Sequence, residues 1–284
     1  MPLILQSPDP LSADDLAAIG TLAQAAEFSR RGDTVAVAAR CAPLDAALRE
    51  TLDGYCGPRR IDWAVVPDGC NLSDFRLVAM DMDSTLITIE CIDEIADFCG
   101  LKAEVSAITE AAMRGEITDF NESLRRRVAL LKGLDASVLD RVYEERLRLS
   151  PGAERMLAGA RELGMKTLLV SGGFVHFTEK LKARLQLDFT RANTLEIVDG
   201  KLTGQVVGEI VNADVKARMV RETCEAIGAR PDQAIVMGDG SNDLKMMAIA
   251  GLSVAFRAKP VVRAQASVAF NFVGLDGLFE LFPR

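Results

Sequence analysis

Three apolar, strand-like segments of this chain each run directly into a loop of small and polar residues. The segments cover residues 75–80, 165–170 and 234–237. After residue 151 the apolar pattern alternates between helix-like and strand-like spacing, as a doubly wound parallel sheet requires. In such sheets ligands bind beyond the carboxyl ends of the strands. We therefore expect an α/β fold with a Rossmann-like parallel sheet, in which the three polar loops meet at one edge.

The first of these loops, Asp81-Met82-Asp83-Ser84-Thr85, sets two carboxylates two residues apart. Side chains at positions i and i+2 of an extended backbone project the same way, so Asp81 and Asp83 can converge on one point. Two close carboxylates raise each other's pKa unless a cation lies between them, and the pair suits a metal-assisted nucleophile beside a general acid. Asp and Ser are also favoured in turns, so the pair taken alone fits a plain turn as well.

The chain has 284 residues, 49% of them apolar, which is enough for two domains with their own cores. Residues 1–72 predict a βαββαβ unit, and the turn-rich boundary at 67–69 precedes a second domain at 73–284. Apolar residues with helical spacing predict a helical insertion at about 88–150. Asp199-Gly200 is a hairpin signal, so we expect one antiparallel excursion from the parallel sheet.

Charge and composition argue against several classes of function. A net charge of −8 is unsuited to general binding of nucleic acid or of anionic membranes. No apolar stretch reaches the roughly 18 residues that a membrane span needs, and the N-terminus lacks the pattern of an export signal. The six cysteines are scattered and form no Cys-x-x-Cys pair. We expect reduced thiols, a cytoplasmic location and no membrane partner.

The order of the polar motifs resembles that of the haloacid dehalogenase superfamily of aspartate-nucleophile phosphatases. The motifs are, in order, Asp81-x-Asp83-x-Thr85, Ser171, Lys216 and Gly238-Asp239-Gly240-x-Asn242-Asp243. Within the superfamily, the Ser-Gly-Gly-Phe form at 171–174 and the Glu-Cys-Ile-Asp-Glu run at 90–94 resemble the phosphoserine phosphatases. The resemblance covers roughly residues 74–275. It implies hydrolysis of O-phosphoserine to serine and inorganic phosphate through an aspartyl-phosphate, the last step of serine biosynthesis.

The resemblance also implies a role for each motif residue. Asp81 would be the nucleophile, Asp83 the general acid and base, and Lys216 the charge that offsets Asp81. Phosphate would be bound by Ser84, Ser171, Gly172, Gly173, Lys216 and Asn242, with help from a helix that begins near Gly173. Mg²⁺, which prefers hard oxygen ligands, would be held by Asp81, the backbone carbonyl of Asp83, Asp239 and Asp243.

Substrate selection is expected in the insertion, which resembles the helical cap of the superfamily. Glu90 matches the position that recognises an amino group, and Arg127 matches the position that grips a carboxylate in a bidentate pair. Met113 and Phe120 would form apolar walls, although the stretch from Met113 to Arg127 is one residue longer than in the family pattern. On the residues alone, Glu90 also fits the first turn of a helix, and an arginine run also fits a solvated face. His176, the only histidine, is not assigned to catalysis.

Other interpretations stay open on the sequence alone. A receiver-type signalling domain also gathers acidic residues and a lysine at a sheet edge, but it needs neither a second aspartate nor a cap. A related phosphatase or phosphotransferase on another small metabolite, such as homoserine phosphate, has the same motifs. In phosphoserine phosphatases the position of residues 1–72 is often held by an ACT-like module that binds amino acids or pairs subunits. A homodimer and an amino-acid effector are therefore both open.

Overall fold

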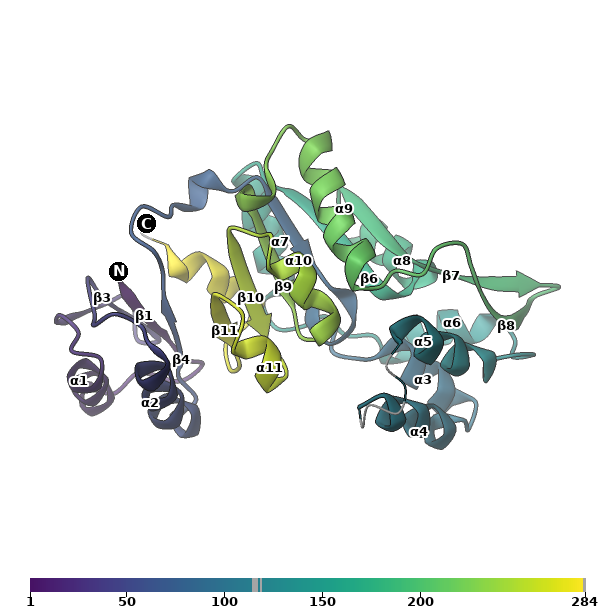
Figure 1. Ribbon diagram of the computed structural model, residues 1–284, viewed down its shortest axis with the longest axis horizontal. Coiled ribbons are helices and arrows are strands. Elements are labelled where there is room, and N and C mark those ends of the chain that lie inside the picture. The colour runs from purple at the N-terminus through teal and green to yellow at the C-terminus, as the bar shows by residue number, and fades with distance from the viewer. Residues whose placement is uncertain (114–116, 118, 283–284) are drawn as a thin grey trace.

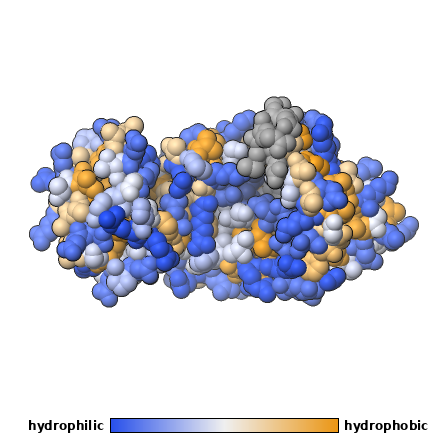
Figure 2. Space-filling view, turned by 90° about the horizontal axis from the view of Figure 1, so that it is seen from below, coloured by the Kyte–Doolittle hydropathy of each residue, from blue (hydrophilic) through white to orange (hydrophobic). Residues whose placement is uncertain are grey.

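The computed structural model describes residues 1–113, 117 and 119–282, and its three parts follow one another along the longest axis (Figure 1). The N-terminal unit lies at one end, the larger sheet in the middle and the helices of the cap at the other end. In Figure 2 a notch marks the N-terminal unit off from the rest, on a face where hydrophilic residues predominate. No helix of the described residues is both long and apolar enough to cross a membrane.

The N-terminal unit has the predicted βαββαβ order. Its elements are β1 (Leu3–Gln6), α1 (Ala13–Leu22), β2 (Phe28–Arg30), β3 (Val35–Ala38), α2 (Ala46–Cys56) and β4 (Asp62–Val65). The strands form an antiparallel sheet in the order β2-β3-β1-β4. Leu3 and Leu5 pack into the core of this unit, whereas Ile4 packs into the core of the larger domain. This alternation follows from the two-residue period of a strand and joins the two parts through one sheet.

A buried carboxylate also joins the two parts. Asp62, at the start of β4, is 2% exposed. It accepts hydrogen bonds from the backbone N–H groups of Asn271, Phe272 and Val273 at 2.8–2.9 Å. Because a buried carboxylate is costly unless it is hydrogen-bonded, these contacts fix how the N-terminal unit docks.

The larger sheet has the order β11-β10-β9-β5-β6-β7-β8. Its strands are β5 (Leu77–Met80), β6 (Lys166–Phe174), β7 (Phe189–Val198), β8 (Lys201–Val207), β9 (Ala234–Gly238), β10 (Leu252–Phe256) and β11 (Val268–Phe270). Neighbouring strands are parallel, except that β7 and β8 form the predicted antiparallel hairpin. Its turn residues Asp199 and Gly200 have φ of 49° and 74°, as this type of hairpin turn requires.

Helices cover both faces of this sheet. They are α7 (Ala153–Glu162), α8 (Val175–Leu185), α9 (Ala213–Ala226), α10 (Leu244–Met247) and α11 (Pro260–Arg263). Val78 and Met80 of β5 pack on the face of α7 and α8, whereas Leu77 and Ala79 pack on the face of α9 and α10. All four residues of β5 are buried, which explains why this strand reads as a continuous apolar run.

The cap lies between β5 and α7. It contains α3 (Cys91–Phe98), α4 (Lys102–Met113), α5 (Phe120–Ala129) and α6 (Ser137–Arg141), followed by a helical turn at Val142–Arg146. The apolar residues Leu124, Val128 and Leu131, spaced as on one face of a helix, are buried. The doubly wound sheet, the helical insertion and the small N-terminal α+β unit together confirm the fold class predicted from the sequence.

Candidate active site

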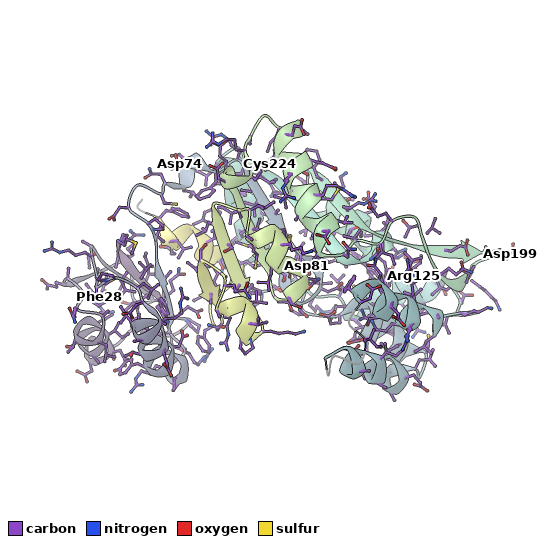
Figure 3. All side chains as sticks on the ribbon, in the orientation of Figure 1. Phe28, Asp74, Asp81, Arg125, Asp199 and Cys224 are labelled. Atoms are coloured by element: carbon purple, nitrogen blue, oxygen red, sulfur yellow. The ribbon has the colours of Figure 1, made fainter. Side chains whose placement is uncertain are left out.

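The site lies at the carboxyl edge of the three central strands, with Asp81 in the middle of the molecule (Figure 3). The last residue of β5, Met80, is in register with Leu169 of β6 and Met237 of β9. The loops that begin at 81 and 239 therefore start at one level of the sheet, beside residues 171–174 at the end of β6. This register brings the three sequence motifs together, as the parallel arrangement predicts.

The loop after β5 directs its two carboxylates in a defined way. The Oδ1 atom of Asp81 accepts a hydrogen bond from the N–H of Met82 at 2.7 Å, and Asp81 is 5% exposed. Ser84 has a φ of 54°, so the backbone reverses directly after Asp83. Asp83 then accepts the N–H of Cys91, at the first turn of α3, at 3.0 Å. The hydroxyl of Ser84 donates to Glu90 at 2.7 Å.

Lys216 is fully buried and lies between two carboxylates. Its Nζ atom is 2.7 Å from Asp81 Oδ2 and 2.7 Å from Asp243 Oδ1. It lies in the first turn of α9, whose N-cap Asn212 accepts from two backbone N–H groups. Burial opposes the charged form of Lys216, but Asp243 and Asp81 outweigh it and raise its pKa. Lys216 is therefore a permanent cation that faces the nucleophile candidate.

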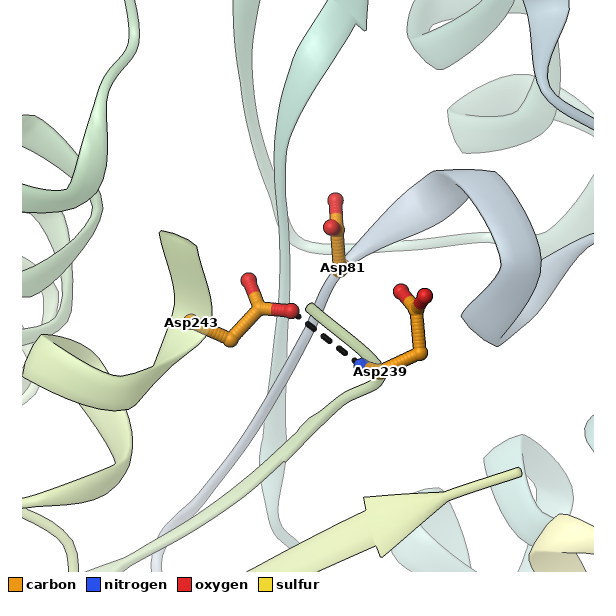
Figure 4. Close-up of side chains that lie close together, drawn as sticks. All are labelled: Asp81, Asp239 and Asp243. Carbon is orange, nitrogen blue, oxygen red and sulfur yellow. Dashed lines mark hydrogen bonds between the residues drawn. The ribbon is translucent and has the colours of Figure 1, made fainter. Parts of the chain in front are cut away.

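Asp81, Asp239 and Asp243 form a cluster of carboxylates (Figure 4). One oxygen from each lies within 4.8 Å of the others. Asp243 accepts the backbone N–H groups of Asp239 at 3.2 Å and Gly240 at 3.0 Å, which orients it in the loop after β9. A Cβ at Gly238 would collide with the carboxylate of Asp243, so this loop needs glycine there. Three oxygen donors at this spacing fit a hard divalent cation such as Mg²⁺.

Two carboxylates of the site have a pKa near neutrality. Burial, and then the charge of Glu90, raises the pKa of Asp83 to about 7. Burial, and then Asp243 and Glu90, raises the pKa of Asp239 to about 7. Burial also raises the pKa of Asp81, against the charge of Lys216. A group that acts as both general acid and general base needs a pKa near the working pH, so that its protonated and ionised forms are both populated. Asp83 has that property.

The C-terminal part of β6 contributes Ser171, which is fully buried. Its Oγ accepts the N–H of Gly173 at 2.8 Å, which leaves the hydroxyl hydrogen available to a ligand. A Cβ on Gly173 would lie 2.5 Å from Asp83 Oδ2, so this position needs glycine. The helix expected to begin near Gly173 is α8, whose N-cap is Phe174. Strand β6 continues through Phe174, and α8 begins at Val175.

Residues of the cap and of the sheet domain enclose a cavity of about 570 Å³. Asp81, Asp83, Ser84, Gly172, Gly173, Asp239 and Asn242 line it from the sheet domain and its first loop. Glu90, Phe120 and Arg127 line it from the cap. Phe120 opens α5, and its ring lies 3.1 Å from where a Cβ on Gly172 would be. Met113 ends α4, and its side chain lies outside the described part of the structure.

The arginine run of α5 divides between water and the cavity. Arg125 and Arg126 are exposed, whereas Arg127 is half-buried and lines the cavity. Burial lowers the pKa of Arg127, and the charges of Asp93 and Glu90 oppose that change. One side of the run is thus the solvated face that the sequence allows, and the other faces the site. His176 lies elsewhere, with its Nε2 3.1 Å from Asp140.

Several residues that line the site were not identified from the sequence. Asp93, Asp119, Ser123 and Lys259 also line the cavity. Asp93, Asp119 and Ser123 lie on helices or at a helix N-cap, and the apolar pattern of the sequence does not show that these positions face the site. Lys259 follows the apolar strand β10, so its position after a parallel strand was the signal that could have found it.

Fold and site together define the class of this protein: a hydrolase with a doubly wound α/β sheet, a carboxylate centre at the edge of that sheet and a helical cap. A sequence model of the haloacid dehalogenase-like hydrolases matches residues 75–251. A second model, of a domain of unknown function (DUF4072), matches residues 3–52.

Relatives and solved structures agree with this class. A phosphoserine phosphatase from Polaromonas sp. (strain JS666) is 59% identical over 214 residues, which cover 74% of this chain and 91% of the relative. The structure of a probable phosphoserine phosphatase from Vibrio cholerae has a TM-score of 0.82 at 38% identity, over 99% of this chain and 85% of that one. The structure of a phospho-aspartyl intermediate analogue of phosphoserine phosphatase has a TM-score of 0.69 at 36% identity, over 74% of this chain and 99% of that one. The chain therefore belongs to the haloacid dehalogenase-like hydrolases, among the phosphoserine phosphatases.

Proposed function

We propose that this protein hydrolyses O-phosphoserine to serine and inorganic phosphate, through an aspartyl-phosphate on Asp81, as the last step of serine biosynthesis. The observation that carries this proposal is the position of Asp81. Its carboxylate lines the cavity, with the Nζ atom of Lys216 2.7 Å away and a carboxylate oxygen of Asp239 and of Asp243 within 4.8 Å. The phospho-aspartyl analogue among the similar structures supports the same chemistry.

In the first half-reaction an oxygen of Asp81 forms a bond to phosphorus while the bond from phosphorus to the serine oxygen breaks. Asp83 gives its proton to the departing serine oxygen, which its pKa of about 7 allows at neutral pH. Lys216 offsets the negative charge of Asp81 as the phosphoryl group approaches. The products of this step are serine and a phosphorylated Asp81.

In the second half-reaction water attacks phosphorus and the bond from phosphorus to Asp81 breaks. Asp83, now deprotonated, takes the proton of that water, which returns it to its starting form. Ser171 donates its free hydroxyl hydrogen to a phosphoryl oxygen, and Asn242 and the backbone at Gly172 and Gly173 face the same group. Inorganic phosphate leaves with Asp81 restored.

A bound divalent cation would stabilise the ionised carboxylates of the site and the negative charge on the phosphoryl oxygens. Asp81, Asp239, Asp243 and the backbone carbonyl of Asp83 would hold it, and we propose Mg²⁺ because all donors are oxygen atoms. Thr85 donates to Asp239 at 3.3 Å and so orients one of these carboxylates.

The cap selects the amino-acid part of the substrate. Glu90 accepts the ammonium group, and Arg127 binds the carboxylate from the facing helix α5. Phe120 provides an apolar wall around the carbon atoms of the substrate. Ser84 holds Glu90 at 2.7 Å and keeps its carboxylate at the edge of the cavity.

The test is the release of inorganic phosphate, with and without Mg²⁺, from phosphoserine, phosphohomoserine, phosphoethanolamine and an aryl phosphate. We expect Mg²⁺-dependent release that is fastest with phosphoserine. Asp81→Asn should abolish release and leave no phosphate adduct in the intact-protein mass, whereas Asp33→Asn, an exposed aspartate of the N-terminal unit, should behave as wild type. Release at the wild-type rate by Asp81→Asn, or a preference for phosphohomoserine, would contradict the proposal.

For the N-terminal unit we propose one of two roles, a site for an amino-acid effector or a contact between two subunits. The βαββαβ topology is shared by modules with either role. Sedimentation of the full chain tests the homodimer, and titration of the phosphatase activity with serine tests the effector. A monomer that serine does not affect would remove both.

A further inference from the structure

The active-site cavity is acidic, although the proposed substrate is an anion. Of the described residues, six carboxylates line it: Asp81, Asp83, Glu90, Asp93, Asp119 and Asp239. Two cations, Arg127 and Lys259, line it as well. The buried Lys216 is already bonded to two carboxylates. Phosphoserine has two anionic groups, a phosphate and a carboxylate, and one ammonium group. The cavity therefore needs cations that are not already paired with its own carboxylates.

Lys259 offers such a charge. Its backbone N–H donates to the carbonyl of Asp239 at 3.1 Å, which ties the loop after β10 to the acidic loop after β9. Pro260 follows as the first residue of α11 and restricts the backbone there. The side chain is exposed, and within the described part of the chain no carboxylate lies within the 4.0 Å of an ion pair. Among the described residues Lys259 thus has a fixed backbone and an ammonium group that forms no ion pair, and its charge opposes the rise that burial causes in the pKa of Glu90 and of Asp239 across the cavity.

We propose that Lys259 is a substrate-binding residue that attracts and holds an anionic group of the phosphorylated substrate. It acts from the sheet domain, whereas Arg127 acts from α5 of the cap. This inference rests on the proposed function, because it assigns a second cation to the same substrate site. Lysine suits this position, since its compact charge on a flexible stem follows an anion without a fixed geometry.

The position of Lys259 determines which kinetic constant it affects. An exposed ammonium group attracts the substrate and the transition state about equally, so its loss raises KM and leaves kcat nearly unchanged. Salt screens such an interaction because it acts through solvent. Substitution of a residue that mattered only for folding would not change the salt dependence of kcat/KM, and it would not raise KM while leaving kcat unchanged.

The experiment compares Lys259→Met with Lys245→Met at low and high ionic strength. Lys245 is an exposed lysine of α10 that is bonded to Asp214 at 2.7 Å, outside the cavity, so it is the matched control. For Lys259→Met we expect a rise in KM for phosphoserine of about tenfold, with a flatter salt dependence of kcat/KM. Lys259→Arg should restore most of the affinity. Lys245→Met should match wild type.

Two substrates separate the anionic groups. Phosphoethanolamine has the phosphate and the ammonium group of phosphoserine but no carboxylate. If Lys259 binds the phosphate, Lys259→Met raises KM for both substrates; if it binds the carboxylate, the variant raises KM for phosphoserine alone. An unchanged KM for both substrates, with an unchanged salt dependence, overturns the inference.

A binding measurement keeps this inference distinct from the proposed function. Asp81→Asn does not hydrolyse phosphoserine, so binding can be measured with it. Calorimetry in the presence of Mg²⁺ gives its affinity for phosphoserine and for inorganic phosphate. The same two affinities are measured for the double variant that also carries Lys259→Met. Weaker binding of either compound by the double variant supports the role of Lys259. Equal affinities overturn it. A wild-type protein that hydrolyses other phosphate esters but not phosphoserine refutes the proposed function alone, because the phosphate affinities still report on Lys259.

Discussion

Gly173→Ala is the sharpest test of how the site is packed. The added Cβ would lie 2.5 Å from Asp83 Oδ2, 2.7 Å from Met82 Cε and 3.1 Å from Ser171 Oγ. The backbone at Gly173 does not have a positive φ, so alanine is not strained there by its own conformation. The three heavy atoms nearest to the new methyl group all belong to side chains, and one of them is an oxygen of the proposed acid.

The size of the effect follows from these distances. Non-bonded atoms are most stable at about 3.5 Å or more, so the carboxylate of Asp83 has to move by about 1 Å. A displacement of that size in a catalytic group costs about a hundredfold in rate. The atoms that must move are the ends of the Asp83 and Met82 side chains, so the free energy of unfolding should fall by only about 1 kcal/mol. We therefore expect a large loss of kcat in a protein that remains folded.

The assay is phosphate release from phosphoserine with Mg²⁺, together with a urea unfolding curve. Gly54→Ala is the control, because Gly54 lies within α2 and, apart from its neighbours and the backbone of its own helix, nothing lies within 4 Å of its added Cβ. That change should leave kcat unaltered and stabilise the protein by about 0.5–1 kcal/mol. If folded Gly173→Ala keeps kcat within twofold of wild type, then the position of Asp83 does not limit the reaction, and our account of it is wrong.

Four further outcomes follow from the same geometry. Because Asp83 must be protonated to act as the acid, kcat/KM should fall as the pH rises through about 7; Asp83→Asn should lack this limb in a pH–rate profile. Arg127→Ala should lower kcat/KM for phosphoserine by about 10- to 100-fold more than for an aryl phosphate, and equal losses would mean that Arg127 does not read the carboxylate. Lys216→Met leaves Asp81 and Asp243 without their cation. Its free energy of unfolding, measured in urea with a chelator present, should therefore be about 3–5 kcal/mol lower than that of wild type. A chelator should abolish phosphate release, and Mg²⁺ should restore it and raise the Tm of the stripped protein, which an unchanged Tm would contradict.

The fold could be predicted from the sequence because its signals are local. The buried run at 77–80, the alternation of elements after residue 151 and the Asp199-Gly200 turn each depend on residues close together in the chain. The βαββαβ order of the N-terminal unit was predicted in the same way. The end of β6 was not predicted, because this strand extends by pairing of Phe174 with Asn193 of β7, which no local pattern indicates.

The candidate site was only partly predictable. The sequence located the residues that follow β5, β6 and β9, since parallel strands bring their carboxyl ends together. It did not indicate that Asn193, buried in β7, bonds the carbonyl of Gly172 at 2.7 Å and the N–H of Val211 at 2.8 Å. This amide joins the C-terminal part of β6 to the segment before α9, and such a link depends on the packing of distant strands.

By itself, the sequence of this protein determined which chemical groups are present and at which ends of the strands they lie. The two-residue period of extended backbone and the common direction of parallel strands are enough for that. Only the tertiary structure decided how charge is balanced: Lys216 is buried between Asp81 and Asp243, Arg127 turns inward, and Lys259 lies at an acidic cavity without an ion pair to any described carboxylate. Electrostatic interaction and desolvation depend on distances through space and on burial, and neither can be read from positions along a chain.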